Sequence, residues 1–187
     1  MSGNRGKKEK GKLSLSKVYQ LLSFGPVVLI TSKHKDKMNI MPISWVTPVD
    51  FEPPLIALII GDQSYTFKVV KRSKELVINI PSRSLVRKVV ACGDCSGKNT
   101  DKFKKFRFTP IPSKKVKAPG IKECIASIEC KVVDSSMANK YNIFIVKGVN
   151  CTINSGAFGK CFRADKVKPL LYLGEGFFST PSKIFKA

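Results

Sequence analysis

Short apolar stretches rich in β-branched residues recur along the chain and are separated by polar turns. Stretches of about four to eight such residues, bounded by turn-forming residues, are typical of β-strands. This pattern predicts strands at 26–31, 40–47, 54–60, 76–80, 123–134, 141–150 and 169–173, with turns at 32–37 and 48–53. Residues 123–134 alternate between apolar and polar positions, which is typical of an antiparallel strand with one buried face.

Three segments are predicted to be helices instead: residues 15–22, 64–73, where the apolar positions have a helical period, and 84–91. Ser64 is a predicted N-cap for the second of these helices. A doubly wound parallel sheet is disfavoured, because the first three strands leave no room for a helix between them. The predicted fold class is therefore mainly β, a small antiparallel barrel with short α insertions.

Length and charge narrow the class of protein further. The chain has 187 residues, 43% of them hydrophobic, and 34 basic against 13 acidic residues give a net charge of +21. This length is sufficient for a full hydrophobic core. We predict a basic, disordered tail at 1–12 and a single domain at 13–187. The longest apolar run, 55–60, is too short to cross a membrane, and the polar start predicts no signal peptide, so we expect a cytoplasmic protein.

The positive charge raises the question of nucleic-acid binding. Only six of the basic residues are arginines, the residue that reads phosphates and bases through a planar fork, and the lysines are spread along the chain. The small number of arginines and the wide spacing of the lysines disfavour a dedicated nucleic-acid role. A tail that contacts nucleic acid loosely stays open as a third, non-enzymatic hypothesis.

Six cysteines are present, and without a secretory signal we expect free thiols. Cys92 and Cys95 form one CxxC motif, but no second pair accompanies it and the chain has one histidine, so no metal site is predicted. A redox dithiol stays open as an alternative. Against it, Gly93 and Gly97 predict a loop at 92–99, whereas redox CxxC motifs usually open a helix.

Two segments have the residue types that bind phosphate. Ser64, Tyr65 and Thr66 lie where a strand passes into a helix, so hydroxyls and free backbone amides converge at the positive end of a helix dipole. Ser96, Gly97 and Lys98 offer a hydroxyl, close backbone approach and a cation. The simpler alternatives are a helix cap for Ser64 and a turn for Ser96 and Gly97. Neither GxxxxGK[ST] nor GxGxxG occurs, which excludes the commonest nucleotide-binding motifs.

Five segments in this order resemble the flavin reductase-like family, the FMN-binding split barrels that include flavoredoxin. They are FGPVVLIT at 24–31, NIMPISWVTPVDFEPPL at 39–55, SYTFKVVKRSKELVINIP at 64–81, CGDCSGKNTDKF at 92–103 and KPLLYLGEGFF at 168–178. The resemblance implies an antiparallel Greek-key split β-barrel that forms a homodimer and binds FMN, with FAD as an alternative. It also implies NAD(P)H as the electron donor.

The resemblance also implies which residues hold the flavin. Those matching the strand beside the isoalloxazine ring are Asn39, Ser44, Trp45 and Thr47. Those matching the helix start that holds the phosphate or ribityl chain are Ser64, Tyr65 and Thr66. Those matching the loop that also reaches the phosphate, and the DKF motif after it, are Ser96, Gly97, Lys98 and Lys102. Lys98 replaces an arginine of the family, which keeps the charge but loses the bidentate fork.

The sequence departs from the family at two further places. Many relatives have a histidine near the start of the late strand, where this chain has Asn142, which does not titrate. Cys95 is unusual in a phosphate loop. No catalytic side chain is therefore assigned, because the flavin ring carries the chemistry; Asn142 and Cys95 are the candidates.

The leading functional hypothesis is an FMN-dependent oxidoreductase of the flavin reductase type. It would pass electrons from NAD(P)H through FMN to a flavin, a metal or a protein acceptor. The alternative is a flavoredoxin-like electron carrier without direct NAD(P)H turnover, reduced by a ferredoxin-like protein partner. The net charge of +21 suits docking to such an acidic partner.

Overall fold

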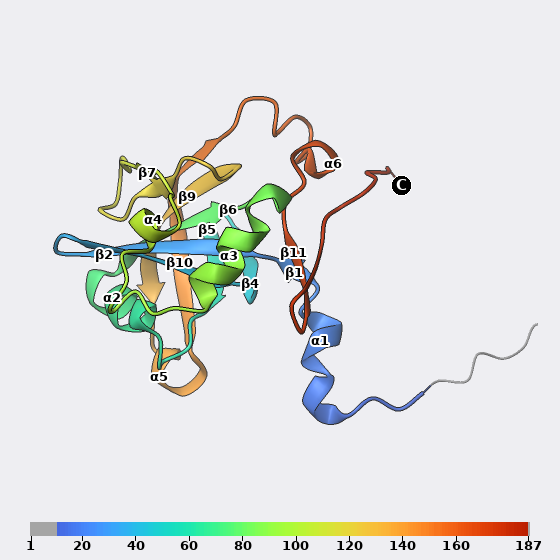
Figure 1. The fold of residues 1–187 in the computed structure, drawn as a ribbon, viewed down its shortest axis with the longest axis horizontal. Coiled ribbons are helices and arrows are strands. Elements are labelled where there is room, and N and C mark those ends of the chain that lie inside the picture. The colour runs from blue at the N-terminus through green and yellow to red at the C-terminus, as the bar shows by residue number, and fades with distance from the viewer. Residues whose placement is uncertain (1–10, 187) are drawn as a thin grey trace, which may run out of the picture.

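Antiparallel strands make up most of the structure, a computed structural model that describes residues 11–186 (Figure 1). All but the last two residues of the predicted tail at 1–12 lie outside the described residues. The strands are β1 (Gly25–Pro26), β2 (Val28–His34), β3 (Lys37–Ile43), β4 (Val46–Phe51), β5 (Pro54–Ile59), β6 (Glu75–Ile80), β7 (Pro110–Ile111), β8 (Gly120–Ile121), β9 (Ala126–Asp134), β10 (Ile143–Ile153), β11 (Leu171–Gly174) and β12 (Phe177–Ser179). The helices are η1 (Leu15–Lys17), α1 (Tyr19–Leu22), α2 (Tyr65–Ser73), η2 (Arg83–Leu85), α3 (Val86–Gly93), α4 (Lys102–Lys105), α5 (Ala138–Tyr141) and α6 (Ala164–Val167).

Seven strands form one sheet in the order β3-β2-β6-β9-β10-β5-β4, and each neighbouring pair is antiparallel. The two edge strands, β3 and β4, are joined only by Ser44 and Trp45. Because consecutive Cα atoms lie about 3.8 Å apart, so short a link brings the two edges of the sheet together. The sheet therefore curls into a barrel that its hydrogen bonds do not close. The predicted fold class, mainly β and antiparallel with short helical insertions, is confirmed.

The break between β3 and β4 was not predicted. The apolar run 40–47 predicts one strand, but the chain leaves β3 after Ile43 and enters β4 at Val46. The turn predicted at 48–53 was also wrong, since most of it belongs to β4 and only two residues separate β4 from β5. Ser44 and Trp45 are neither glycine nor proline, so the local sequence has no signal for a break there.

The main sheet is covered by apolar side chains on both faces. Val28 and Ile30 of β2 belong to one core cluster, which also includes side chains of β5, β6, β9 and β10 and so fills the inside of the barrel. Leu29, between them, belongs to a second cluster on the side of α3. Burial of a side chain of this size contributes about 1.5–3 kcal/mol. Helices α2 and α3 are thereby fixed against the sheet.

A smaller sheet, β1-β11-β12, lies beside the main one. Its strand β11 confirms the strand predicted near 169–173, whereas β12 was not predicted. The helix predicted at 15–22 is divided into η1 and α1. The side chain of Gln20, in α1, donates a hydrogen bond of 3.0 Å to the carboxylate of Glu175. Figure 1 accordingly shows α1 next to β1 and β11, outside the main sheet.

Candidate functional site

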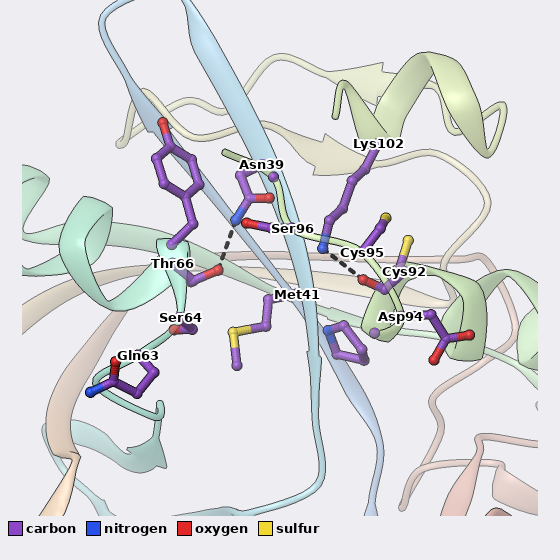
Figure 2. Close-up of a pocket in the computed structure, with 14 residues that line it drawn as sticks. Asn39, Met41, Gln63, Ser64, Thr66, Cys92, Asp94, Cys95, Ser96 and Lys102 are labelled. Atoms are coloured by element: carbon purple, nitrogen blue, oxygen red, sulfur yellow. Dashed lines mark hydrogen bonds between the residues drawn. The ribbon is translucent and has the colours of Figure 1, made fainter. Parts of the chain in front are cut away.

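A pocket of about 360 Å³ opens where the start of α2, strand β3 and the segment after α3 meet (Figure 2). Three segments far apart in the sequence supply its walls. Its lining residues are Asn39, Met41, Pro42, Gln63, Ser64, Tyr65, Thr66, Cys92, Gly93, Asp94, Cys95, Ser96, Gly97 and Lys102. Ten of the residues singled out from the sequence are among them: Asn39, Ser64, Tyr65, Thr66, Cys92, Gly93, Cys95, Ser96, Gly97 and Lys102.

The first turn of α2 forms one wall of this pocket. Ser64 has an extended backbone conformation and its hydroxyl accepts a hydrogen bond of 3.1 Å from the Phe67 backbone N–H, so Ser64 is the N-cap as predicted. The backbone N–H groups of Tyr65 and Thr66 precede the first intrahelical hydrogen bonds. They are donors at the positive end of the helix dipole, an arrangement that favours anions.

Asn39 connects β3 to α2 across the pocket. Its side-chain amide donates a hydrogen bond of 2.7 Å to the hydroxyl of Thr66, and this contact is buried (Figure 2). Its side-chain oxygen is buried and has no hydrogen-bond partner. A buried polar atom without a partner is costly, about 1–3 kcal/mol. This oxygen is sealed inside the pocket wall against Gly97, so a bound ligand does not contact it directly.

Gly97 packs directly on Asn39. A Cβ atom at Gly97 would lie 1.8 Å from the side-chain oxygen of Asn39, which no real contact allows. Glycine is thus required at this position by close approach. The backbone of the 96–98 segment and Asn39 together fix the shape of this side of the pocket.

Lys102 brings a buried amine to the pocket. It is the first residue of α4, whose N-cap Asp101 accepts a hydrogen bond of 3.1 Å from the Lys104 backbone N–H. The Lys102 amine donates a hydrogen bond of 2.6 Å to the backbone carbonyl of Cys92. Burial lowers the pKa of Lys102, and the nearby thiols of Cys95 and Cys92 oppose this shift in part. An anion in the pocket would stabilise the charged amine.

Lys98 is placed differently from its neighbours. It lines an adjoining hollow of about 450 Å³ together with Lys37 and Asp101. The Lys37 amine donates a hydrogen bond to the backbone carbonyl of Lys98 and lies 5.3 Å from the centre of the Tyr65 ring. The predicted phosphate loop is therefore divided, with Ser96 and Gly97 in the main pocket and Lys98 at its margin.

Ser44, Trp45 and Thr47 lie at and beyond the junction of β3 and β4. Ser44 lines an apolar hollow of about 220 Å³, which shares Pro42 and Gly93 with the main pocket. Trp45 is 48% exposed, and its ring meets the ring of Tyr19 edge-on, with a centroid distance of 6.2 Å. Thr47 is exposed on β4, where its hydroxyl donates to the Pro48 carbonyl at 3.3 Å. Of the three, only Ser44 touches the hollowed surface described here.

Asn142 is not among the residues that line the pocket. It ends α5 with a left-handed backbone, φ 61°. Its side-chain oxygen accepts a hydrogen bond of 3.0 Å from the Asp62 backbone N–H, and its own carbonyl accepts one of 3.0 Å from Ile60. These contacts give Asn142 a role in holding α5 to the chain between β5 and α2.

Sequence reasoning missed several residues of the two hollows. Met41, Pro42, Gln63 and Asp94 line the main pocket, and Val27, Tyr172 and Phe178 line the apolar hollow. Met41 and Pro42 lie inside a segment on which the resemblance rests, but their side chains carry no chemical signal. Tyr172 and Phe178 reach the site from the far end of the chain, which only the tertiary structure reveals.

No helix within residues 11–186 is long and apolar enough to cross a membrane. Among the same residues, no group of three or more histidine, cysteine or acidic side chains is placed to hold a metal ion.

The chain belongs to the family defined by the flavin reductase like domain, whose model matches residues 23–181. A relative from Pyrococcus abyssi, described as an uncharacterized protein, is 36% identical over 140 residues, which is 75% of this chain and 80% of that protein. This family membership confirms the resemblance that the five sequence segments indicate.

Solved structures of flavoredoxins are similar to this one over nearly the whole chain. Flavoredoxin of Desulfovibrio vulgaris matches with a TM-score of 0.83 and 25% identity, covering 97% of both chains. Flavoredoxin from Methanosarcina acetivorans matches with a TM-score of 0.81 and 25% identity, covering 96% of this chain and 95% of that one. The barrel and its short helices are therefore the fold of this family.

Proposed function

We propose that this chain binds FMN in the main pocket and acts as an oxidoreductase of the flavin reductase type, with NAD(P)H as electron donor. The observation that carries the proposal is the convergence of the α2 amides, the Ser96 hydroxyl and the Lys102 amine in one pocket. Family membership and the similar flavoredoxin structures support it. FAD is the alternative flavin.

The residues of the site suit the two ends of FMN. The phosphate is a dianionic group with several acceptor oxygens, and the start of α2, the Ser96 hydroxyl and Lys102 supply donors and positive charge. The isoalloxazine ring is flat and largely apolar, and the hollow beside Pro42 and Gly93 is lined mainly by apolar side chains. Bound flavin supplies hydride and electron transfer, while the protein supplies binding, orientation and electrostatics.

Removing the hydroxyls at the start of α2 tests this site. We expect Ser64→Ala combined with Thr66→Ala to weaken FMN binding at least tenfold, because the hydroxyls and the cap are lost together. The measurement is an FMN titration followed by flavin fluorescence, with thermal unfolding as a check that the variant is folded. Thr66→Ser, which keeps the hydroxyl, is the matched control and should bind FMN as the wild type does. Unchanged affinity in the double variant would reject the phosphate site.

A flavoredoxin-like electron carrier is the second candidate, favoured by the two flavoredoxin structures at TM-scores of 0.83 and 0.81. Such a protein would take electrons from a ferredoxin-like partner without oxidising NADH or NADPH. Steady-state oxidation of both nucleotides by the FMN-loaded protein separates the candidates. Turnover with either nucleotide supports the reductase, and reduction only by a ferredoxin-like protein supports the carrier.

We further propose that the protein works as a homodimer in the cytoplasm. β4 is an edge strand of the main sheet and exposes Val49 and Phe51. An exposed edge strand with apolar side chains is a ready surface for pairing with another chain. Trp45, at the junction that precedes β4, extends this apolar surface toward the site.

A further inference from the structure

Two residues of the pocket, Cys92 and Cys95, have no role in the proposed function. Cys92 lies in the last turn of α3, and the following Asp94 keeps a helical backbone, φ −74° and ψ −5°. Helix α3 therefore includes the start of the segment predicted as a loop. Residues three apart on a helix have Cβ atoms about 5–6 Å apart. A disulfide requires Cβ atoms about 3.5–4.5 Å apart, so the pair would have to close by about 1–2 Å. Cys95 lies just beyond the end of α3, where the backbone is free of the helix and can make this adjustment.

Cys92 and Cys95 differ in exposure, and a reactive pair of thiols needs one accessible and one protected sulfur. Cys92 is fully buried, and burial raises the pKa of its thiol to about 12. Cys95 is partly exposed, and its thiol makes only a long contact, 3.7 Å, with the Ala91 carbonyl. In thiol exchange the accessible sulfur attacks first and the second sulfur resolves the mixed disulfide.

Lys102 links the two thiols to the phosphate side of the pocket. Figure 2 shows its side chain running beside Cys95 to the end of α3, where the amine donates its hydrogen bond to the Cys92 carbonyl. The Lys102 amine is close enough to act on the charge of both thiols.

We propose that Cys92 and Cys95 form a reversible dithiol–disulfide couple in the pocket wall, which takes two electrons from the flavin bound there. The flavin step rests on the proposed function. In it, the S–S bond breaks, each sulfur gains one electron and one proton, and reduced flavin is oxidised. The dithiol then reduces a low-molecular-weight disulfide. Cys95 attacks it and one thiol leaves with a proton; Cys92 displaces the second thiol, and the Cys92–Cys95 bond forms again.

The couple itself is tested without flavin. The full-length protein is equilibrated in buffers of graded reduced and oxidised glutathione, its free thiols are alkylated, and its peptides are mapped by mass spectrometry. We expect a Cys92–Cys95 disulfide that appears and disappears cooperatively across the series. Cys161→Ser, which removes an exposed cysteine, should leave the transition unchanged, and Cys95→Ser should abolish it. Alkylation of both Cys92 and Cys95 throughout the series would overturn the proposal.

The flavin step is tested by anaerobic reductive titration of the FMN-loaded protein, oxidised beforehand with glutathione disulfide. We expect the wild type to take up about two more electrons per subunit than Cys95→Ser. Equal uptake would overturn the flavin step. Failure to bind FMN would overturn the proposed function and this step with it, while the glutathione series still decides whether the couple exists.

Discussion

The Lys102 amine lies in the pocket wall with a backbone carbonyl as its hydrogen-bond partner and no ion pair among the described residues. Burial lowers its pKa, against the opposing effect of the two thiols. A buried charge without an opposite charge beside it destabilises the flavin-free protein. The same charge strengthens the binding of an anionic ligand. Lys102 is therefore the single residue whose environment points most directly to an anion.

Replacing Lys102 tests this reading. We expect Lys102→Met to weaken FMN binding by about tenfold to a hundredfold, since a hydrogen bond to a charged group contributes about 1.5–3 kcal/mol.

A lysine whose folded-state pKa is lowered opposes folding most below that pKa, and this cost disappears as pH rises toward its ordinary value of about 10.4. The unfolding free energy of the wild type should therefore rise, relative to that of Lys102→Met, as the pH goes from neutral to alkaline. FMN titration and urea unfolding at both pH values are the measurements, and equal FMN affinity would contradict the assignment.

The close contact between Gly97 and Asn39 is open to a direct test. In Gly97→Ala the new Cβ would lie 1.8 Å from the Asn39 oxygen, so Asn39 must move and its hydrogen bond to Thr66 must lengthen or break. We expect a loss of about 1–3 kcal/mol in unfolding free energy, as for other overpacked sites, together with weaker FMN binding. Gly61→Ala is the control, because nothing lies within 4 Å of its added Cβ. Equal stability of the two variants would show that the close approach is not essential.

At the scale of elements, a buried carboxylate holds the irregular segment between β7 and β8 to the main sheet. Glu129 of β9 accepts hydrogen bonds from the backbone N–H groups of Lys114, at 3.0 Å, and Lys115, at 2.6 Å. The Asn150 side chain of β10 donates a third, at 2.7 Å. Burial raises the pKa of Glu129, but these hydrogen bonds together outweigh burial and hold the pKa below its ordinary value.

A carboxylate with a lowered pKa stabilises the fold most above its ordinary pKa of about 4.3, and that contribution is lost as pH falls through the lower folded-state value. We therefore expect Glu129→Gln to lose about 1–3 kcal/mol of unfolding free energy at pH 7. The difference in unfolding free energy between the wild type and Glu129→Gln should become smaller in acid, where the Glu129 carboxylate is protonated. Chemical unfolding at pH 7 and below pH 4 measures both effects, with the exposed Glu52→Gln as control. A gap that does not change with pH would contradict the role of the charge.

The elements could be predicted from the sequence where a pattern is long enough. The strands that become β2, β5, β6, β9 and β10 have runs of β-branched residues, and Ser64 marks the start of α2. The division of 40–47 into β3 and β4 could not be predicted, because pairing with β2 and with β5 decides it. Strands β7, β8 and β12 have two or three residues each, too few for any periodicity.

The candidate site was only partly predictable, for a related reason. Ser64 to Thr66, Ser96 and Gly97 have the residue types that phosphate binding needs, and the resemblance added Asn39 and Lys102. That these segments share one pocket follows from the barrel, which brings β3 between α2 and the end of α3. The local sequence predicts neither the burial of the Asn39 oxygen nor the apolar hollow next to Pro42.

At the scale of the whole molecule, the proposed homodimer predicts a sensitive position on β4. Phe51 is 90% exposed on this edge strand, and a charge there would be buried without a partner in a dimer. We expect Phe51→Asp to shift the protein toward monomers in sedimentation velocity experiments. Phe185→Asp is the control, since Phe185 is also 90% exposed but lies near the C-terminus. A wild type that is already monomeric, or a Phe51→Asp variant that stays dimeric, would contradict this surface.

FMN binding in the pocket between α2, β3 and the end of α3 is the property on which the proposed activity depends. The most direct measurement is a visible absorption spectrum of the purified protein during FMN titration, followed by anaerobic addition of NADH or NADPH. Binding in this pocket predicts a yellow protein that saturates with FMN, and reductase activity predicts that the yellow colour bleaches when a nucleotide is added. A colourless protein that leaves the spectrum of added FMN unchanged would contradict FMN binding in this pocket.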